Sequence, residues 1–495
     1  MNTFTRLSWK SNRRCCRLLF GNKHWGRFFH DITLQTACYE TTQPVIGQPS
    51  PLTHPHLLKP NELVPGFTKK DFIERRDRLA EALVRLKPNG THLVLIPAAM
   101  TQYMSDKIPY VFRQNTDFRY LTGCLEPDSA LLLIIKPDGS HKSKLFMRDK
   151  NAHTELWEGP RTGVDVAPQL FGIDEAKSIN ALESELKESA KNCTFWYDFR
   201  NPAHRNIHNS VVSFLSNSGS KCLESPIKLI HELRLIKSKA EQDLMLRSAQ
   251  ITSDAITQTI RNTEVGHTEH QLFAMVDYHC RMNGAEYLAY PPVVAAGNNA
   301  NIIHYINNTQ KIMEGELILM DAGCELHGYC SDITRTWPVS KQFTPLQQTL
   351  YEIVLDVQTN LISLCSEEKS LDELFKLMCV MLGKRLKEAH VLTKAADSMT
   401  LEEMAFKFCP HHVSHYLGMD VHDTGTINRT VHLQEGMVIT VEPGIYVNEK
   451  NNLAKKEFRG IGVRIEDDVL ISNGCAKVLS LCPKRVDELQ EIYKT

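Results

Sequence analysis

The chain lacks the signals of several large classes of protein. Its apolar runs are short: the run at 130–135 spans about six residues, whereas a helix that crosses a bilayer needs roughly 20. Among its 14 cysteines no two form a C-x-x-C pair, which argues against zinc ribbons and thioredoxin-like sites and favours reduced thiols. Neither sign of charge is in clear excess, since the sequence contains 57 basic and 58 acidic residues. We therefore expect no membrane insertion and no general affinity for nucleic acid.

Familiar catalytic motifs are missing as well. The sequence contains no H-E-x-x-H, no G-x-S-x-G and no phosphate-binding G-x-x-x-x-G-K. Its composition is that of a globular protein, because 42% of the 495 residues are hydrophobic and 23% are charged. A chain of this length is expected to form about two or three domains.

The amino-terminal end has a composition of its own. Before Asp31 there is no acidic residue, yet seven basic residues are present, with aromatic and aliphatic residues between them. This composition is typical of a mitochondrial transit peptide and predicts location in the mitochondrial matrix, alongside a cytosolic pool. A disordered basic arm is the alternative. Residues 41–65 are rich in Pro, Gln and Thr and predict an extended linker. Transit peptide and linker are assigned to 1–55, so a chain that begins near Thr53 is expected to be active.

Folded sequence is expected to begin near Phe67. Apolar side chains share one face of a predicted helix at 69–86. Strand-like apolar runs follow at 92–96, 130–135 and 144–147. The alternation predicts an α/β amino-terminal domain over 66–222, which ends where S-N-S-G-S at 216–220 and then Pro226 interrupt the chain.

The remaining residues, 226–495, mix both kinds of element. Helical patterns occur at 240–255, 269–283, 345–364 and 371–390. Strand patterns occur at 317–321, 333–338, 437–442 and 463–471. Such a mixture predicts one large α+β domain.

Carboxylates stand at the ends of these apolar strands, where an unpaired charge is costly. Asp321 ends one strand and Asp332 opens the returning one, so a hairpin is expected to bring them face to face. Glu442 ends another apolar run, and Arg464 and Glu466 share one face of a later strand. One or two such acids are explained by structural ion pairs. Four together require a cation, and oxygen-rich sites suit divalent metals.

Histidines are concentrated in the same part of the chain. Four of them fall within the twelve residues 411–422: His411, His412, His415 and His422. A single histidine is usually a satisfied core residue, but a cluster between two acid-bearing strands favours ligation. Four carboxylates and one imidazole are the set that holds two metals bridged by carboxylates and a water or hydroxide.

Five of these residues occur in a distinctive order, which is Asp321, Asp332, His415, Glu442 and Glu466. Their contexts are DAGCELHGYCSDITRT, HHVSHYLGMDVHD, VITVEPGIY and GVRIEDDVL. In this order and these contexts the chain resembles the pita-bread metallopeptidases, and more narrowly aminopeptidase P, the Xaa-Pro aminopeptidases. RQNTDFRYLTGCLEPD at 113–128 resembles the amino-terminal domain of that subfamily, and the transit-like start resembles its mitochondrial member. The resemblance implies an α/β amino-terminal domain followed by an α+β pita-bread catalytic domain.

The resemblance also implies a role for each matching residue. Asp321 would bind one metal, His415 and Glu442 the other, and Asp332 and Glu466 would bridge both. The remaining implied catalytic residues are His304, His411, His422 and Arg464, together with Glu442 as a proton shuttle. The implied substrate-binding residues are Tyr290, His304, Asp321, His422 and Tyr446.

The implied activity is release of the N-terminal residue of peptides and proteins, preferentially when proline is second. Two divalent metal ions, expected to be Mn²⁺, would bridge the attacking hydroxide. The implied biological task is trimming of imported mitochondrial proteins by a homodimer. The alternatives are a prolidase restricted to Xaa-Pro dipeptides and a non-catalytic pita-bread binding module. The second is disfavoured because such modules typically lack several of the five ligands.

Overall fold

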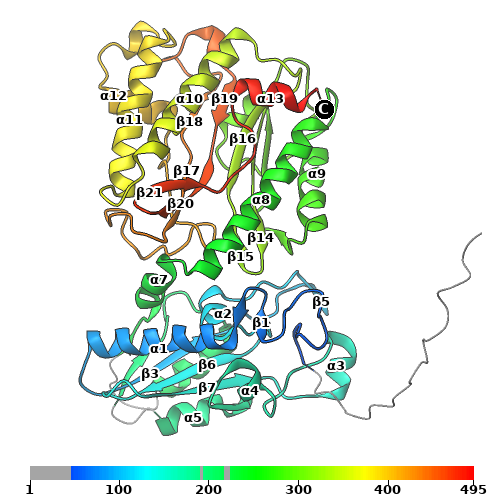
Figure 1. Cartoon of the computed structure of the whole chain (residues 1–495), viewed down its shortest axis with the longest axis vertical. Coiled ribbons are helices and arrows are strands. Elements are labelled where there is room, and N and C mark those ends of the chain that lie inside the picture. The colour runs from blue at the N-terminus through cyan, green and yellow to red at the C-terminus, as the bar shows by residue number, and fades with distance from the viewer. Residues whose placement is uncertain (1–45, 190–192, 217–222, 495) are drawn as a thin grey trace, which may run out of the picture. The chain divides into compact units, whose positions relative to one another are not determined.

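The structure is a computed structural model that describes residues 46–189, 193–216 and 223–494. The predicted transit segment falls outside the described residues except for 46–55. Two domains follow one another along the described chain (Figure 1). No described helix combines the length and the apolarity that crossing a bilayer requires.

The amino-terminal domain is built on a six-stranded mixed sheet with the strand order β10-β9-β3-β6-β7-β8. The strands of this domain are β1 (Glu62–Val64), β2 (Phe67–Thr68), β3 (Thr91–Pro97), β4 (Tyr103–Ser105), β5 (Ile108–Pro109), β6 (Ala130–Ile135), β7 (His141–Met147), β8 (Glu175–Ser178), β9 (Cys193–Trp196) and β10 (Leu223–Glu224). Its helices are α1 (Lys69–Leu86), α2 (Thr116–Thr122), α3 (Ala152–Glu158), α4 (Ala167–Phe171), α5 (Leu182–Ser189) and α6 (Arg205–Ser216).

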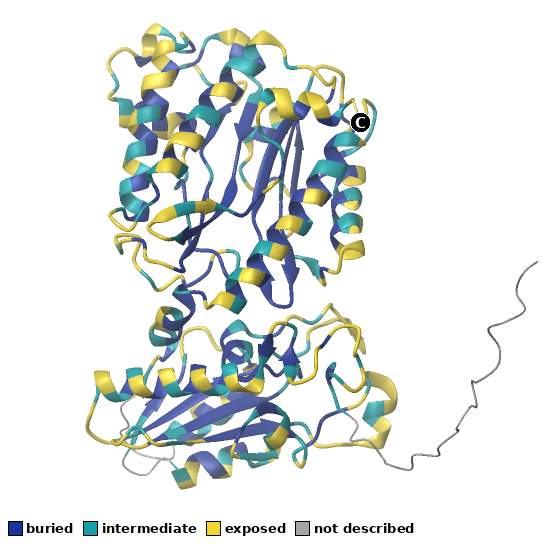
Figure 2. Ribbon diagram, viewed as in Figure 1, coloured by how far each residue is buried: buried dark blue, intermediate teal, exposed yellow. Residues whose placement is uncertain are grey.

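The central strand β6 is apolar throughout because helices cover both faces of this sheet. Leu131 and Leu133 of β6 pack in the cluster that contains residues of α1, whereas Leu132 packs with residues of α5 and α6. Figure 2 shows the strands buried and the outer faces of the helices exposed. The helix predicted at 69–86 and the strand predicted at 130–135 are both present with those bounds.

The segment before α1 differs from the predicted linker. Gly47 N–H donates to Thr162 Oγ1 at 3.0 Å, and Leu125 N–H donates to the side-chain oxygen of Gln48 at 2.9 Å. Leu58 is buried, and β1 pairs with β2. The prediction that folded sequence begins near Phe67 is therefore wrong for the described residues from 47 onward. Their backbone and side-chain amides find partners on loops that are distant in sequence, which local composition does not reveal.

In the carboxy-terminal domain, short sheets are flanked by long helices, with α8 and α9 on one side and α10 to α12 on the other (Figure 1). Its helices are α7 (Ile227–Leu235), α8 (Lys239–Arg261), α9 (Glu269–Met282), α10 (Pro345–Leu364), α11 (Leu371–Glu388), α12 (Leu401–Phe408) and α13 (Val486–Ile492). Its strands are β11 (Tyr287–Leu288), β12 (Val293–Ala296), β13 (Leu317–Ala322), β14 (Cys324–Leu326), β15 (Tyr329–Cys330), β16 (Ile333–Pro338), β17 (Val438–Val441), β18 (Gly444–Val447), β19 (Ile461–Arg464), β20 (Asp467–Ser472) and β21 (Cys475–Val478).

Helices α8 to α12 of this domain each start at a Ser or Thr that caps the helix. Ser238 and Glu241 form a capping box at the start of α8, and Thr344 caps α10, which has Pro345 in its first turn. The prediction of a single strand at 463–471 is wrong. Strand β19 pairs with β18 and strand β20 pairs with β17, so the chain changes its partner at 465–466. Glu466 N–H donates instead to the backbone oxygen of Thr334 at 3.1 Å. Glu466 therefore belongs to neither pair of strands. The predicted boundary between domains at 222–226 stays a prediction.

Candidate metal centre

The five predicted ligands converge from five places along the carboxy-terminal domain. Asp321 lies near the end of β13, and Asp332 precedes β16, the antiparallel partner of β13. Glu442 directly follows β17, and Glu466 lies between β19 and β20. His415 lies in the segment before β17, where Thr440 N–H donates to its backbone oxygen at 3.0 Å.

Three of these side chains form a compact cluster. Ligand atoms of Asp332, His415 and Glu466 all lie within 4.8 Å of one another. His415 Nε2 is 3.4 Å from Asp332 Oδ2 and 3.6 Å from Glu442 Oε1. Its Nδ1 lies 3.1 Å from the backbone oxygen of Tyr416. That backbone oxygen can accept a hydrogen bond from a proton on Nδ1. The lone pair of Nε2 then faces the carboxylates, and this lone pair is what a histidine uses to bind a metal.

Asp321 and Asp332 are joined by one phenol. Tyr290 Oη lies 2.5 Å from an oxygen of each carboxylate. Burial and the two carboxylates raise the pKa of Tyr290 well above its ordinary value, so the phenol keeps its proton. The hairpin predicted from the sequence thus brings these two acids together, and Tyr290 holds the pair.

Arg464 lies on the opposite side of Asp321. Its Nη2 donates to Asp321 Oδ2 at 2.5 Å, and its Nη1 donates to Tyr446 Oη at 2.9 Å. Burial opposes the charge of this guanidinium, but Tyr446, Asp321 and Glu466 raise its pKa well above the ordinary value. A permanent cation therefore balances part of the negative charge of the cluster.

The predicted histidines occupy different positions around the cluster. His411 Nε2 lies 2.9 Å from Tyr446 Oη, and its Nδ1 is 3.7 Å from Glu442 Oε2. The ring of His422 contacts that of His415, with centroids 4.4 Å apart. His304 and His422 are exposed.

The electrostatics of the cluster suit a divalent cation. Burial, together with Asp332 and Glu442, raises the pKa of Glu466 well above the ordinary value. Burial lowers the pKa of His415, but Asp332 and Glu442 outweigh it and raise that pKa to about 9. The cluster therefore favours bound positive charge, whether protons or a cation. Its carboxylate and imidazole donors suit a divalent metal.

Two residues near the site have functions that the sequence did not indicate. Thr334 Oγ1 donates to Glu466 Oε2 at 2.6 Å and accepts from Arg464 Nε at 3.1 Å. Glu269, fully buried at the start of α9, accepts four hydrogen bonds of 2.8–2.9 Å from the 296–310 segment that carries His304. Thr334 lies in the context quoted around Asp332 and Glu269 lies in none, but each contact spans 27 or more positions of sequence, so no local signal identifies these partners.

Comparison with known proteins defines the class to which this site belongs. Residues 243–473 match metallopeptidase family M24, and residues 72–196 match the amino-terminal domain of aminopeptidase P. The chain belongs to metallopeptidase family M24, and it is a hydrolase of the aminopeptidase type. Membership in this family implies divalent metal ions as cofactor.

Individual relatives give a narrower likeness. Xaa-Pro aminopeptidase 3 of Mus musculus is 43% identical over 459 residues, which cover 90% of each chain. The mitochondrial intermediate cleaving peptidase 55 of Arabidopsis thaliana is 36% identical, covering 91% of this chain and 89% of that protein. The structure of proline aminopeptidase P II from Yersinia pestis superposes with a TM-score of 0.80 at 31% identity, covering 86% of this chain and 100% of that one. The predicted family and fold class are confirmed.

Proposed function

We propose that the chain is an aminopeptidase that releases the N-terminal residue of peptides and proteins, preferentially when proline is second. The observation that carries this proposal is the cluster of Asp332, His415 and Glu466, flanked by Asp321 and Glu442. These five residues would hold two divalent ions, which we expect to be Mn²⁺. When bound, such ions lower the pKa of water toward 7 and supply the hydroxide nucleophile for hydrolysis.

The side chains around the cluster would divide the remaining tasks. Burial raises the pKa of the Glu442 carboxyl, although His415 opposes this, so Glu442 is suited to accept a proton from water and release it again. Burial and Arg464 lower the pKa of His411 to about 4, so its imidazole is neutral near pH 7. We therefore assign His411 to orientation of Tyr446 rather than to donation of a proton.

The exposed histidines are suited to contact the substrate. The peptide nitrogen leaves as an amine, so it must gain a proton as the bond breaks, and in proline that proton is its only hydrogen. We propose that His304 and His422, which are exposed beside the cluster, orient the scissile carbonyl and assist that protonation. Tyr290 and Asp321, joined by their hydrogen bond, would face the N-terminal residue of the substrate.

The biological setting is a separate proposal. The name of the mitochondrial relative from Arabidopsis thaliana, together with the acid-free basic start of the chain, supports trimming of imported proteins in the mitochondrial matrix. Residues 1–55 fused to a neutral reporter should bring it to mitochondria. A reporter that stays in the cytosol would contradict the location without affecting the enzymatic assignment.

The homodimer also stays a proposal. Several large apolar side chains are exposed on the β4–β5 hairpin and on α3: Tyr103, Met104, Ile108, Leu156 and Trp157. Exposed apolar side chains of this size support an interface with a second copy of the chain. Sedimentation of the purified protein should give the mass of a dimer, and a monomer would contradict the proposal.

Matched peptides test the proposed activity. Xaa-Pro-Xaa should be cleaved after its first residue, and Xaa-Ala-Xaa should be cleaved more slowly. Cleavage confined to the dipeptide Xaa-Pro would show that the prolidase alternative is correct. Cleavage of none of them by the metal-loaded protein would overturn the proposal.

A further inference from the structure

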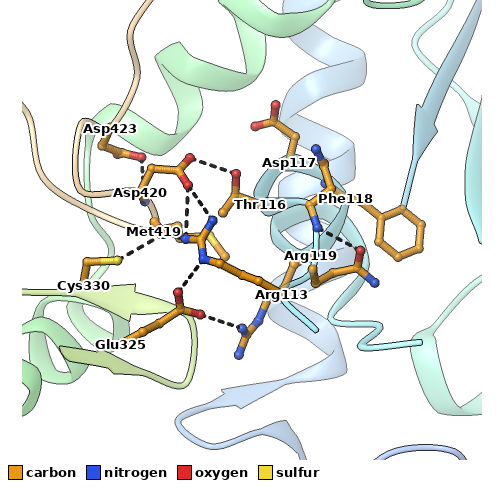
Figure 3. A network of polar contacts seen from close by, with 12 residues as sticks. Arg113, Thr116, Asp117, Phe118, Arg119, Glu325, Cys330, Met419, Asp420 and Asp423 are labelled. Atoms are coloured by element: carbon orange, nitrogen blue, oxygen red, sulfur yellow. Dashed lines mark hydrogen bonds and ion pairs between the residues drawn. The ribbon is translucent and has the colours of Figure 1, made fainter. Parts of the chain in front are cut away.

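Charged side chains connect the amino-terminal domain to the catalytic domain (Figure 3). At the centre is Arg113, which lies between β5 and α2. Its Nε donates to Glu325 Oε2 at 2.7 Å, and Nη1 and Nη2 donate to Asp420 Oδ1 at 3.1 and 3.2 Å. Nη2 also donates to the backbone oxygen of Met419 at 2.7 Å. One guanidinium therefore holds two segments of the other domain at once.

Both segments adjoin proposed metal ligands in the chain. Glu325 lies on β14, within the connection between Asp321 and Asp332. Asp420 lies in the turn between His415 and His422. Because Arg113 contacts both segments, it holds the connection between the proposed ligands Asp321 and Asp332. It also holds the turn that follows the proposed ligand His415.

The turn that carries His422 is compact. Asp423 N–H donates to the backbone oxygen of Tyr416 at 2.9 Å, which folds the chain back on itself. A Cβ on Gly418 would lie 2.4 Å from Asp423 Oδ2, so the turn requires glycine there. The result is that the ring of His422 lies against that of His415.

Other members of the array hold the second oxygen of Asp420. Thr116 Oγ1 donates to Asp420 Oδ2 at 2.8 Å, and Arg234 Nη2 donates to the same oxygen at 2.7 Å. Arg234 also pairs with Asp117 and Asp423. The array contains four cations and four carboxylates, which are Arg113, Arg119, Arg234, Lys237, Asp117, Glu325, Asp420 and Asp423. Its formal charges balance, which makes its partial burial tolerable.

We propose that Arg113 is a positioning residue for catalysis: the amino-terminal domain uses it to hold the turn that places His422 beside the metal centre. The inference rests on the proposed role of His422 at the substrate. It assigns to the amino-terminal domain a part in the chemical step, since loss of Arg113 would leave Asp420 Oδ1, Glu325 Oε2 and the Met419 carbonyl without this donor.

The geometry favours a role in positioning the turn over a role in merely stabilising the contact between the domains. All three nitrogens of the Arg113 guanidinium donate hydrogen bonds, and their acceptors lie in two segments. A lysine ammonium cannot reproduce this arrangement. Its side chain is 38% exposed, so its removal should not unfold the protein. A small displacement of a catalytic group lowers turnover strongly, by as much as about 100-fold for about 1 Å.

The test compares Arg113→Ala, Arg113→Lys and Asp420→Asn with a control, Tyr120→Phe. Tyr120 Oη donates to the backbone oxygen of Leu233, so the control removes a contact between the same domains that does not reach the turn. In the metal-loaded protein, Arg113→Ala should lower kcat for Xaa-Pro-Xaa by about 10- to 100-fold, with KM and metal content little changed. Arg113→Lys should restore part of kcat, Asp420→Asn should resemble Arg113→Ala, and Tyr120→Phe should match the parent protein.

Amide hydrogen exchange over residues 416–424 gives a second readout that needs no activity. Exchange there should be faster in Arg113→Ala and unchanged in Tyr120→Phe. Parent-like kcat and exchange in Arg113→Ala would overturn the proposal, as would equal losses in Tyr120→Phe. If the parent protein cleaved no peptide, the proposed function would fail, while the exchange result would still decide whether Arg113 holds the turn.

Discussion

Replacement of Thr334 by valine should weaken metal binding without changing any ligand. The Thr334 hydroxyl lies fully buried between two charged groups, donating to Glu466 Oε2 at 2.6 Å and accepting from Arg464 Nε at 3.1 Å. Valine has the same shape but neither hydrogen bond. Glu466 would lose the contact that orients it, and Arg464 Nε would lose its acceptor.

The expected magnitude follows from the charge of both partners. A hydrogen bond to a charged group contributes about 1.5–3 kcal/mol, and loss of a partner that orients a ligand lowers metal affinity by about 10- to 100-fold. That range of affinity equals about 1.4–2.8 kcal/mol, so the two estimates agree. Calorimetric titration of the metal-free protein with Mn²⁺ measures the affinity directly.

Thr336→Val is the matched control. Thr336 lies on the same strand and is equally buried, but its hydroxyl contacts only the backbone of Arg464, with the carbonyl at 2.9 Å. This variant should lose some thermal stability and keep its metal affinity. Parent-like affinity in Thr334→Val, or equal weakening in both variants, would refute the reasoning.

Further predictions concern the ligands, the acid stability and the start of the folded chain. Glu466→Gln should lose metal while remaining folded, whereas His422→Ala should keep its metal and lose turnover; elemental analysis beside a peptide assay separates them, and an empty site in His422→Ala would contradict this division. Burial opposes ionisation of Glu185, but hydrogen bonds from Lys144 and Lys177 prevail and lower its pKa from 4.5 to about 2. Its contribution to stability is therefore present above pH 4.5 and lost as the pH falls toward 2, so Glu185→Gln should lower the melting temperature at pH 7 and have little effect near pH 2; an equal loss at both would contradict this. A chain that begins at residue 46 should melt like the full chain, whereas one that begins at residue 53 should melt lower because it lacks Gln48; equal melting would show that the contacts of Gln48 are dispensable.

Local patterns in the sequence predicted much of the fold and led to the proposed ligand set. The helix at 345–364 combines an apolar face, a Thr cap and Pro345, so periodicity and capping agree on its bounds. Asp321, Asp332, His415, Glu442 and Glu466 each sit in a short context that carries its own signal. Their convergence in space follows from the hairpin of β13 and β16 and from the neighbouring strands.

The remaining features depend on contacts that no local pattern records. The alternation of apolar residues stops at the acidic residues 466–468, but this run alone does not reveal that the chain changes its pairing partner there. Thr334 resembles any strand threonine until Glu466, 132 positions away, lies beside it. Gln48 and Arg113 likewise acquire their significance only from partners in distant segments.

Restoration of activity with metal tests the central claim most directly. The protein stripped by a chelator should not cleave Xaa-Pro-Xaa, and stepwise addition of Mn²⁺ should restore turnover that saturates at two equivalents per chain, because the five ligands are proposed to hold two ions. Undiminished turnover in the fully stripped protein would contradict the account.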